Sequence, residues 1–227
     1  MAGRVSQVRW GGAAFLVGAV QFFLAMAVEE LLIPGFSPLT NTISDLGSNV
    51  IAGSYDSIFN VSVILLGLLT WAGVAGLGGA LAPRPSRTAG RVLLVIAGIG
   101  AVGVGLFPET HPGPYHFTFA LLAFAGSGLA LLFLGPAMRG DGRWRGLAAP
   151  SVVLGVITLV ALVLFATGNY GPLREGGMER LIVAPVLLWA AWAGLQMLRW
   201  SPSAGSPHPW SPSPGEPDEP SPAAGSR

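Results

Sequence analysis

The chain has 227 residues, of which 52% are hydrophobic and only 10% are charged, and its formal net charge is +1. A soluble domain carries about 25% charged residues because its surface faces water, so this composition predicts a chain that is surrounded mainly by hydrocarbon. The small net charge gives no support for a nucleic-acid partner, and the absence of cysteine excludes disulfides and thiolate metal sites.

Six apolar segments have, or nearly have, the length that crosses a bilayer. A hydrocarbon core about 30 Å thick needs about 20 apolar residues in helical form, and helices satisfy their backbone hydrogen bonds internally in lipid. The segments cover residues 11–33, 57–82, 91–107, 115–137, 148–168 and 179–198. The sequence therefore predicts an all-α polytopic transmembrane bundle of six helices, formed by residues 1–200.

The first segment has a second interpretation. Arg4 and Arg9 precede it, and Ala25-Met26-Ala27 lies within it, which is also typical of a signal peptide with an A-x-A cleavage site. Because the apolar stretch continues to Ile33, beyond the usual length of such a signal, we favour a retained first span and keep cleavage as the alternative.

The basic residues, all of them arginine, predict the orientation. Most of them lie in the segments on one side of the predicted membrane, which are the segment before the first span, the connections between the second and third spans and between the fourth and fifth, and the segment after the sixth. These residues are Arg4, Arg9, Arg84, Arg87, Arg91, Arg139, Arg143, Arg145 and Arg199. The opposite loops hold only Arg174 and Arg180. Because cytoplasmic loops carry an excess of basic residues, we expect a multi-pass protein of the cell membrane with both termini in the cytoplasm.

Residues 201–227 are rich in proline, serine and glycine. Such a composition buries too little apolar surface to offset the entropy of ordering the chain. We therefore expect a disordered cytoplasmic tail.

The loop after the first span carries the first candidate site residues. Within residues 40–47, Thr42 and Asp45 have the spacing of a helix N-cap and the third helical residue, and Gly47 is a typical helix stop. Asp45 therefore either holds its own turn or presents a carboxylate to the bundle mouth as an acid, a ligand or a partner for Arg180. A polar residue near the hydrocarbon is costly unless it has a hydrogen-bond partner or a functional role. Asn41 and Ser44, in the same loop as Asp45, are therefore candidate binding residues.

The loop after the third span adds Glu109, His111 and His116. Two histidines five residues apart lack the spacing of a helical metal pair, so we expect no metal and no cofactor. His116 is a candidate base, with Glu109 or Asp45 as the acid; its structural alternative is a histidine that bridges loop carbonyl groups at the membrane interface.

Glu179 and Arg180 begin the sixth span. A carboxylate is favourable at a helix N-terminus and a cation is unfavourable there, so Arg180 needs a carboxylate partner. Asp45, Glu109 or Glu175 are the candidates for an ion pair that fixes the first outer loop on the bundle.

These motifs together resemble a known family. They are Ile43-Ser44-Asp45-Leu46-Gly47, Gly105-Leu106-Phe107-Pro108, His116, and Gly177 with Glu179-Arg180. The combination is similar to a bacterial and archaeal family of six-span integral membrane proteins that is classed as a domain of unknown function, over nearly the whole chain except the tail. The resemblance implies a six-span fold and an outward-facing polar cluster.

A looser likeness links the chain to the ceramidase and adiponectin-receptor superfamily, whose hydrolases use Ser, Asp and three zinc-binding His. The likeness would give Ser44, Asp45 and His116 those roles, although a third intramembrane His is missing.

Three hypotheses for function follow. The leading one is a pocket open to the extracytoplasmic side that binds an amphipathic or lipid-like molecule, in a protein whose constant partners are membrane lipids. The second is an intramembrane enzyme that uses carboxylate and histidine acid–base chemistry on a lipid or isoprenoid substrate. The third is a transporter or accessory subunit in which the charges only lock helices together.

Overall fold

The computed structural model describes residues 2–201, so the predicted tail lies almost entirely outside the described residues. Within residues 2–201 the structure has six long helices and no β-strand. The helices are α1 (Ala2–Leu32), α2 (Asp56–Ala80), α3 (Pro85–Leu106), α4 (Tyr115–Met138), α5 (Arg145–Ala166) and α6 (Arg174–Leu198). All six are long and apolar enough to cross a membrane, which confirms the predicted six-helix bundle.

Three helices, α1, α3 and α6, begin at least five residues before the apolar segments predict. The helix α1 starts at Ala2 because its polar first turns pack on the end of α2: Val8 is fully buried, and Arg4 donates from Nε and Nη2 to the carbonyl of Gly79 at 3.0 and 2.8 Å. The helix α6 starts at Arg174, before the apolar residues begin. Hydropathy finds the part of a helix within lipid, and these ends extend beyond it.

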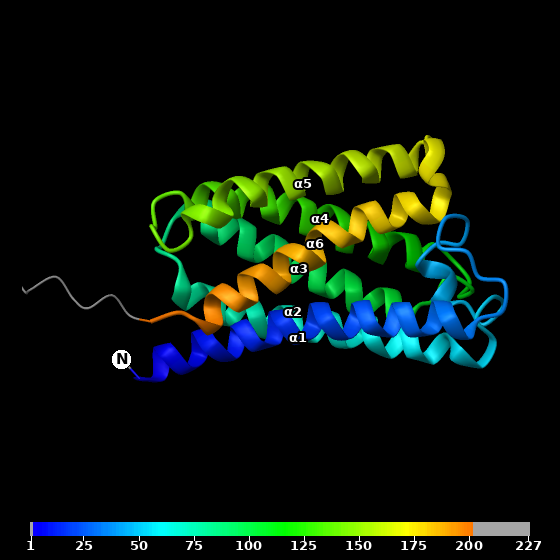
Figure 1. Cartoon of the computed structure of the whole chain (residues 1–227), viewed down its shortest axis with the longest axis horizontal. Helices are drawn as coiled ribbons and strands as arrows, with labels where there is room; N and C mark the ends of the chain where they lie inside the picture. The colour runs from blue at the N-terminus through cyan, green and yellow to red at the C-terminus, as the bar shows by residue number, and fades with distance from the viewer. Residues whose placement is uncertain (1, 202–227) are drawn as a thin grey trace, which may run out of the picture.

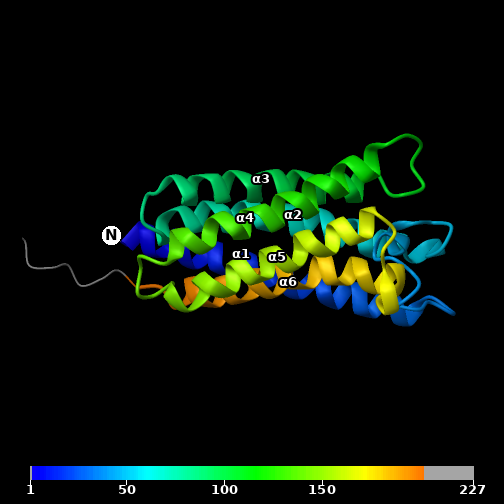
Figure 2. The ribbon, with the colours of Figure 1, turned by 90° about the horizontal axis from the view of Figure 1, so that it is seen from above.

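The helices form a closed ring in chain order. Each helix packs against the one before it and the one after it, and α6 returns to pack against α1. Figures 1 and 2 show the elongated bundle, with the N-terminus and the α2–α3 and α4–α5 connections at one end. The other three connections lie at the opposite end, which we call the cap end.

Glycines bring neighbouring helices into backbone contact. A Cβ added at Gly11 of α1 would lie 2.7 Å from the Cα of Gly76 of α2, and one at Gly12 would lie 2.7 Å from the carbonyl oxygen of Gly194 of α6. Helices in lipid associate through such close contacts because burial from lipid gives little driving force. The small residues therefore close the ring.

Acidic residues gather at the cap end of the bundle. In the described part of the chain only Asp141 lies at the other end. The cap-end acids are Glu29, Glu30, Asp45, Asp56, Glu109, Glu175 and Glu179. The cap end is therefore where the described chain places most of its candidate site residues.

Candidate functional site

The α1–α2 connection folds over the cap end as a packed lid. It contains the short 3₁₀ helices η1 (Ser44–Gly47) and η2 (Gly53–Tyr55). Ile43 and Leu46 are 3% and 0% exposed, and Asn60 of α2 donates from Nδ2 to the carbonyl of Gly47 at 3.2 Å. We call residues 41–47 the cap turn.

Asp45 holds the cap turn together. The Thr42 backbone N–H donates to Asp45 Oδ2 at 2.9 Å, and the Asp45 N–H donates to Thr42 Oγ1 at 3.0 Å. This is the reciprocal pattern of a capping box. Asn41 donates from Nδ2 to the same carboxylate oxygen at 3.1 Å. The carboxylate is therefore engaged within its own turn, the structural alternative that the sequence left open.

Glu179 of α6 fastens the cap turn to the bundle. Its side chain is 2% exposed. Oε2 accepts hydrogen bonds from the backbone N–H groups of Ile43 at 2.5 Å and Ser44 at 3.3 Å, and Oε1 accepts from Ser44 Oγ at 2.9 Å. A buried carboxylate is costly unless hydrogen bonds replace its water, and the backbone of the cap turn supplies them.

His116 extends this network to α3 and α4. Its ring is 3% exposed; Nδ1 lies 3.0 Å from the carbonyl oxygen of Phe107, and Nε2 lies 3.2 Å from Ser44 Oγ. Because a carbonyl only accepts, Nδ1 carries a hydrogen. One imidazole thus joins the end of α3, the start of α4 and the cap turn.

The Ser44 hydroxyl has one hydrogen and lies between two possible acceptors, Glu179 Oε1 and His116 Nε2. If Glu179 is ionised and His116 Nε2 carries no hydrogen, the Ser44 hydroxyl satisfies only one of them. One further proton, on Glu179 or on Nε2, completes both contacts. The two placements differ by a shift of hydrogens across Ser44, so Glu179, Ser44 and His116 form a continuous relay, which we call the cap relay.

Arg180 pairs with a carboxylate that the sequence analysis did not consider. Its Nε and Nη2 atoms donate to Glu30 Oε1 of α1 at 3.2 and 2.5 Å, and Nη1 donates to the carbonyls of Asn41 and Gly176 at 2.9 Å each. The expected partners Asp45, Glu109 and Glu175 were wrong. The reason is that Arg180 lies toward α1, where the last turn of that helix supplies Glu30.

Glu109 lies at the exposed rim of the site, outside the cap relay. Partial desolvation by the surrounding loops raises the pKa of its carboxyl group, and the negative charges of Asp45 and Glu175 raise it further. His111 is exposed as well, and its Nδ1 contacts the carbonyl of Pro112 in its own loop at 3.0 Å. The structure thus brings His116 to the cap relay and leaves Glu109 and His111 outside it.

Glu29 is a second buried carboxyl group near the cap. It is fully buried, and neither of its oxygens has a hydrogen-bond partner among the residues that the structure describes.

Among the residues that the structure describes, no three His, Asp or Glu side chains form a group that could hold a metal ion.

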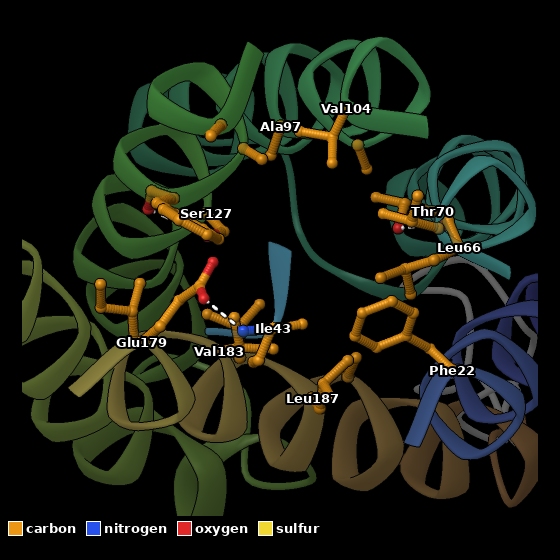
Figure 3. A pocket seen from close by; sticks show the side chains of 18 of the residues that line it. Phe22, Ile43, Leu66, Thr70, Ala97, Val104, Ser127, Glu179, Val183 and Leu187 are labelled. Atoms are coloured by element: carbon orange, nitrogen blue, oxygen red, sulfur yellow. Dashed lines mark hydrogen bonds between the residues drawn. The ribbon is translucent and has the colours of Figure 1, made fainter. Parts of the chain in front are cut away.

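A cavity lies in the centre of the ring, directly below the cap turn. It has a volume of about 110 Å³ and is lined by side chains of α1, α2, α3, α4 and α6 and by Ile43 and Ser44. Figure 3 shows Phe22, Leu66, Ala97 and Leu187 around the opening, with Glu179 at its edge and bonded to Ile43. The cavity is therefore an apolar space with one polar end.

Two further hydroxyl groups line the cavity but are occupied on their own helices. Thr70 Oγ1 donates to the Leu66 carbonyl at 2.8 Å, and Ser127 Oγ donates to the Phe124 carbonyl at 3.1 Å. Such bonds to the preceding turn are common for Ser and Thr in helices. Glu179 and Ser44 consequently supply the polar end.

Sequence reasoning missed Glu30 as the partner of Arg180 and the position of the cavity inside the ring. It did offer a contact from His116 to loop carbonyl groups as the structural alternative, and the structure has one, to Phe107. Glu30 had a signal, since Glu29-Glu30 follows a long apolar run and intramembrane charges need partners. The position of the cavity had none, because voids depend on how the helices pack.

A family model described as protein of unknown function (DUF998) matches residues 16–196. The chain therefore belongs to this family, and with six apolar helices it is a multi-pass integral membrane protein. No curated protein and no solved structure matches it.

Proposed function

We propose that this DUF998 protein binds one lipid-like molecule in the central cavity, with an apolar chain in the ring and a polar end at Glu179 and Ser44. The observation that carries the proposal is the cavity itself. Its wall is apolar except for the Thr70 and Ser127 hydroxyls, which are bonded to their own helices, and its polar end lies at the cap relay. An apolar cavity of about 150 Å³ stays dry and admits a benzene-sized ligand. The present cavity suits a narrow hydrocarbon group.

The shape of the cavity favours a chain over a compact ligand. Its lining on α6 runs from Glu179 to Ala190, which at 1.5 Å per residue is about 16 Å. A volume of about 110 Å³ is smaller than a long chain, so we expect the lining side chains to rotate aside as the chain enters. An unbranched or methyl-branched hydrocarbon chain fits this space better than a fused ring.

The polar end favours a ligand that donates a hydrogen bond. The oxygens of Glu179 accept hydrogen bonds, and in its ionised form Glu179 opposes an anionic head group. A hydroxyl or amino group at the end of the chain would donate to Glu179 or Ser44. We therefore expect a long-chain alcohol or amine to bind, and the carboxylic acid of the same chain length to bind more weakly.

The test measures binding of 1-dodecanol, dodecane and dodecanoate to purified protein in lipid nanodiscs, by displacement of a fluorescent long-chain alcohol. We expect the alcohol to compete best. Ala97→Leu fills the cavity from α3 and should abolish binding, while Val92→Leu, on a side chain of the same helix that is 53% exposed, should not. Equal binding by wild type and Ala97→Leu would contradict the proposal.

A second candidate function is acid–base catalysis on the bound molecule. The observation that favours it is the distance of 3.2 Å from Ser44 Oγ to His116 Nε2, which is close to the reach required of a nucleophile and its base. The Phe107 carbonyl would orient the imidazole, and Glu179 would exchange the proton across Ser44. Asp45 and Glu109, the acids that the sequence suggested, would then only shape the rim.

Glu179→Gln separates the two functions. Glutamine keeps an acceptor for the cap turn and can donate to Ser44, so ligand binding should persist. It cannot ionise, so turnover of an ester of the bound alcohol should stop. Turnover that survives Glu179→Gln would exclude this relay as the catalytic device.

A further inference from the structure

A groove on the outside of the bundle lies beside the central cavity. It runs between α1 and α6, has a volume of about 420 Å³ and is almost entirely apolar except for Arg180. Phe23, Leu24 and Leu188 line it and are 56%, 54% and 64% exposed. In a membrane this surface contacts lipid chains, so the groove is already filled by the kind of group that the cavity suits.

The groove and the cavity share one wall. Ile43, Val183 and Leu187 line both spaces. Figure 3 shows these three residues together on the α6 side of the cavity. These three residues therefore border the cavity on one side and the lipid-facing groove on the other.

The helices beside this wall are held at its two ends. Toward the other end of the bundle, Gly12 of α1 and Gly194 of α6 bring the backbones into contact. At the cap end, Arg180 joins Glu30 of α1 to the cap turn. From Gly194 toward the cap end α6 diverges from α1, as Figure 1 shows, and the residues that line the groove lie on this part of the two helices.

The route through the cap from water is closed more firmly. Opening it would break the hydrogen bonds that Glu179 accepts from Ile43 and Ser44, and the bond from Asn60 to Gly47. Leaving a buried polar group without its partner is strongly unfavourable. The side wall consists of the apolar side chains of Val183, Leu187 and Ile43, which take part in none of these hydrogen bonds.

We infer that the ligand enters the central cavity sideways from the membrane, between α1 and α6, and that it is drawn from the leaflet that surrounds the cap end. This inference rests on the proposed function. The hydrocarbon chain moves from the groove past Ile43, Val183 and Leu187, while its polar end reaches Glu179 beneath the cap turn. The bilayer itself is thus the source of the ligand, and the cap keeps water out during exchange.

The experiment measures association and dissociation rates of the fluorescent long-chain alcohol by stopped flow in nanodiscs. Ala184 lines the groove and not the cavity, so Ala184→Trp obstructs the entrance without changing the binding space. We expect both rates to fall by about tenfold or more, a barrier increase of at least about 1.4 kcal/mol, at unchanged affinity. The matched control is Val160→Trp on α5, where the native side chain is 53% exposed.

The outcomes separate the route from the proposed function. If wild type binds the alcohol and Ala184→Trp exchanges it as fast as Val160→Trp does, the side route is wrong. If Asn60→Ala, which loosens the cap, speeds exchange while Ala184→Trp has no effect, the ligand enters through the cap. If wild type binds no alcohol, the proposed function fails, and this inference fails with it.

Discussion

Glu179 and Glu29 are both buried carboxyl groups near the cap, in opposite states of hydrogen bonding. Glu179 receives three donors from the cap turn, whereas Glu29 has no partner in the described structure. Removing a group that satisfies buried donors costs more than removing one that satisfies none. Replacing Glu179 should therefore lower the free energy of unfolding more than replacing Glu29.

Replacing Glu179 tests the fastening of the cap. Glu179→Ala leaves the N–H groups of Ile43 and Ser44 without an acceptor, which should lower the free energy of unfolding by about 1–3 kcal/mol for each donor. Glu179→Gln keeps an acceptor and should lose much less. Denaturant titration in detergent measures both. Glu29→Gln, which leaves no N–H group of the cap turn without an acceptor, is the control and should cost less than Glu179→Ala. Equal losses for Ala and Gln would contradict the assigned role.

Glu109 should make stability depend on pH. Its pKa in the folded protein is raised above the ordinary 4.5, so the stability associated with this residue is complete below pH 4.5 and is lost as the pH rises through the raised value. Glu109→Gln should therefore melt at a higher temperature than wild type at pH 7 and at the same temperature below pH 4.5. Melting curves across this range test the prediction.

A background substitution identifies the cause of that dependence. Because the charge of Glu175 contributes to the raised pKa of Glu109, the gain from Glu109→Gln should be smaller in a Glu175→Gln background. A gain that is the same at every pH would show that titration of Glu109 is not its source.

At this scale the sequence predicted the residues better than their pairings. The spacing of Thr42 and Asp45 correctly indicated a capped turn, because that motif is local. The partner of Arg180 was wrong, because Glu30 is about 150 positions away in the chain and only the packing of α1 against α6 brings it close. Long-range polar pairs depend on helix rotation, which hydropathy does not encode.

At the scale of the elements, glycine contacts set the distance between helices. A Cβ at Gly100 of α3 would lie 2.3 Å from the backbone nitrogen of Ala123 in α4. Neither backbone can yield without moving a whole helix, because both atoms belong to regular helical turns. Close approach of this kind replaces the hydrophobic driving force that helices lack in lipid.

Gly100→Ala should therefore force α3 and α4 apart. We expect a loss of about 1–3 kcal/mol, the usual cost of overpacking, seen as a lower melting temperature. Gly146→Ala in α5 is the control, since a Cβ there meets nothing within 4 Å and alanine favours a helix. Similar melting temperatures for the two variants would rule out a steric role for Gly100.

The spans themselves were predictable because lipid permits few alternatives. An apolar run of sufficient length must be helical to satisfy its backbone, and each predicted segment became one helix. The cavity was not predictable, because it arises where Ala97 of α3 faces Phe22 and Leu187 across the ring. Its existence depends on the rotations of the five helices that line it.

At the scale of the whole molecule, the closed ring separates the charges. The cap end carries nearly all the acids of the described chain, and the opposite end carries most of its arginines. The connections alternate between the two ends along the chain (Figure 2). If the arginine-rich end is cytoplasmic, the cap and the rim around it face the other side of the membrane.

Single cysteines test this orientation cleanly, because the native chain has none. Ala82 and Gly142 lie in exposed connections at the arginine-rich end, and Thr110 and Ser54 lie in exposed connections at the cap end. In intact cells a membrane-impermeant thiol reagent should label cysteines at the last two positions and not at the first two. Labelling at all four sites after permeabilisation is the control for reactivity. The reverse pattern in intact cells would place the cap in the cytoplasm, and the ligand would then come from the inner leaflet.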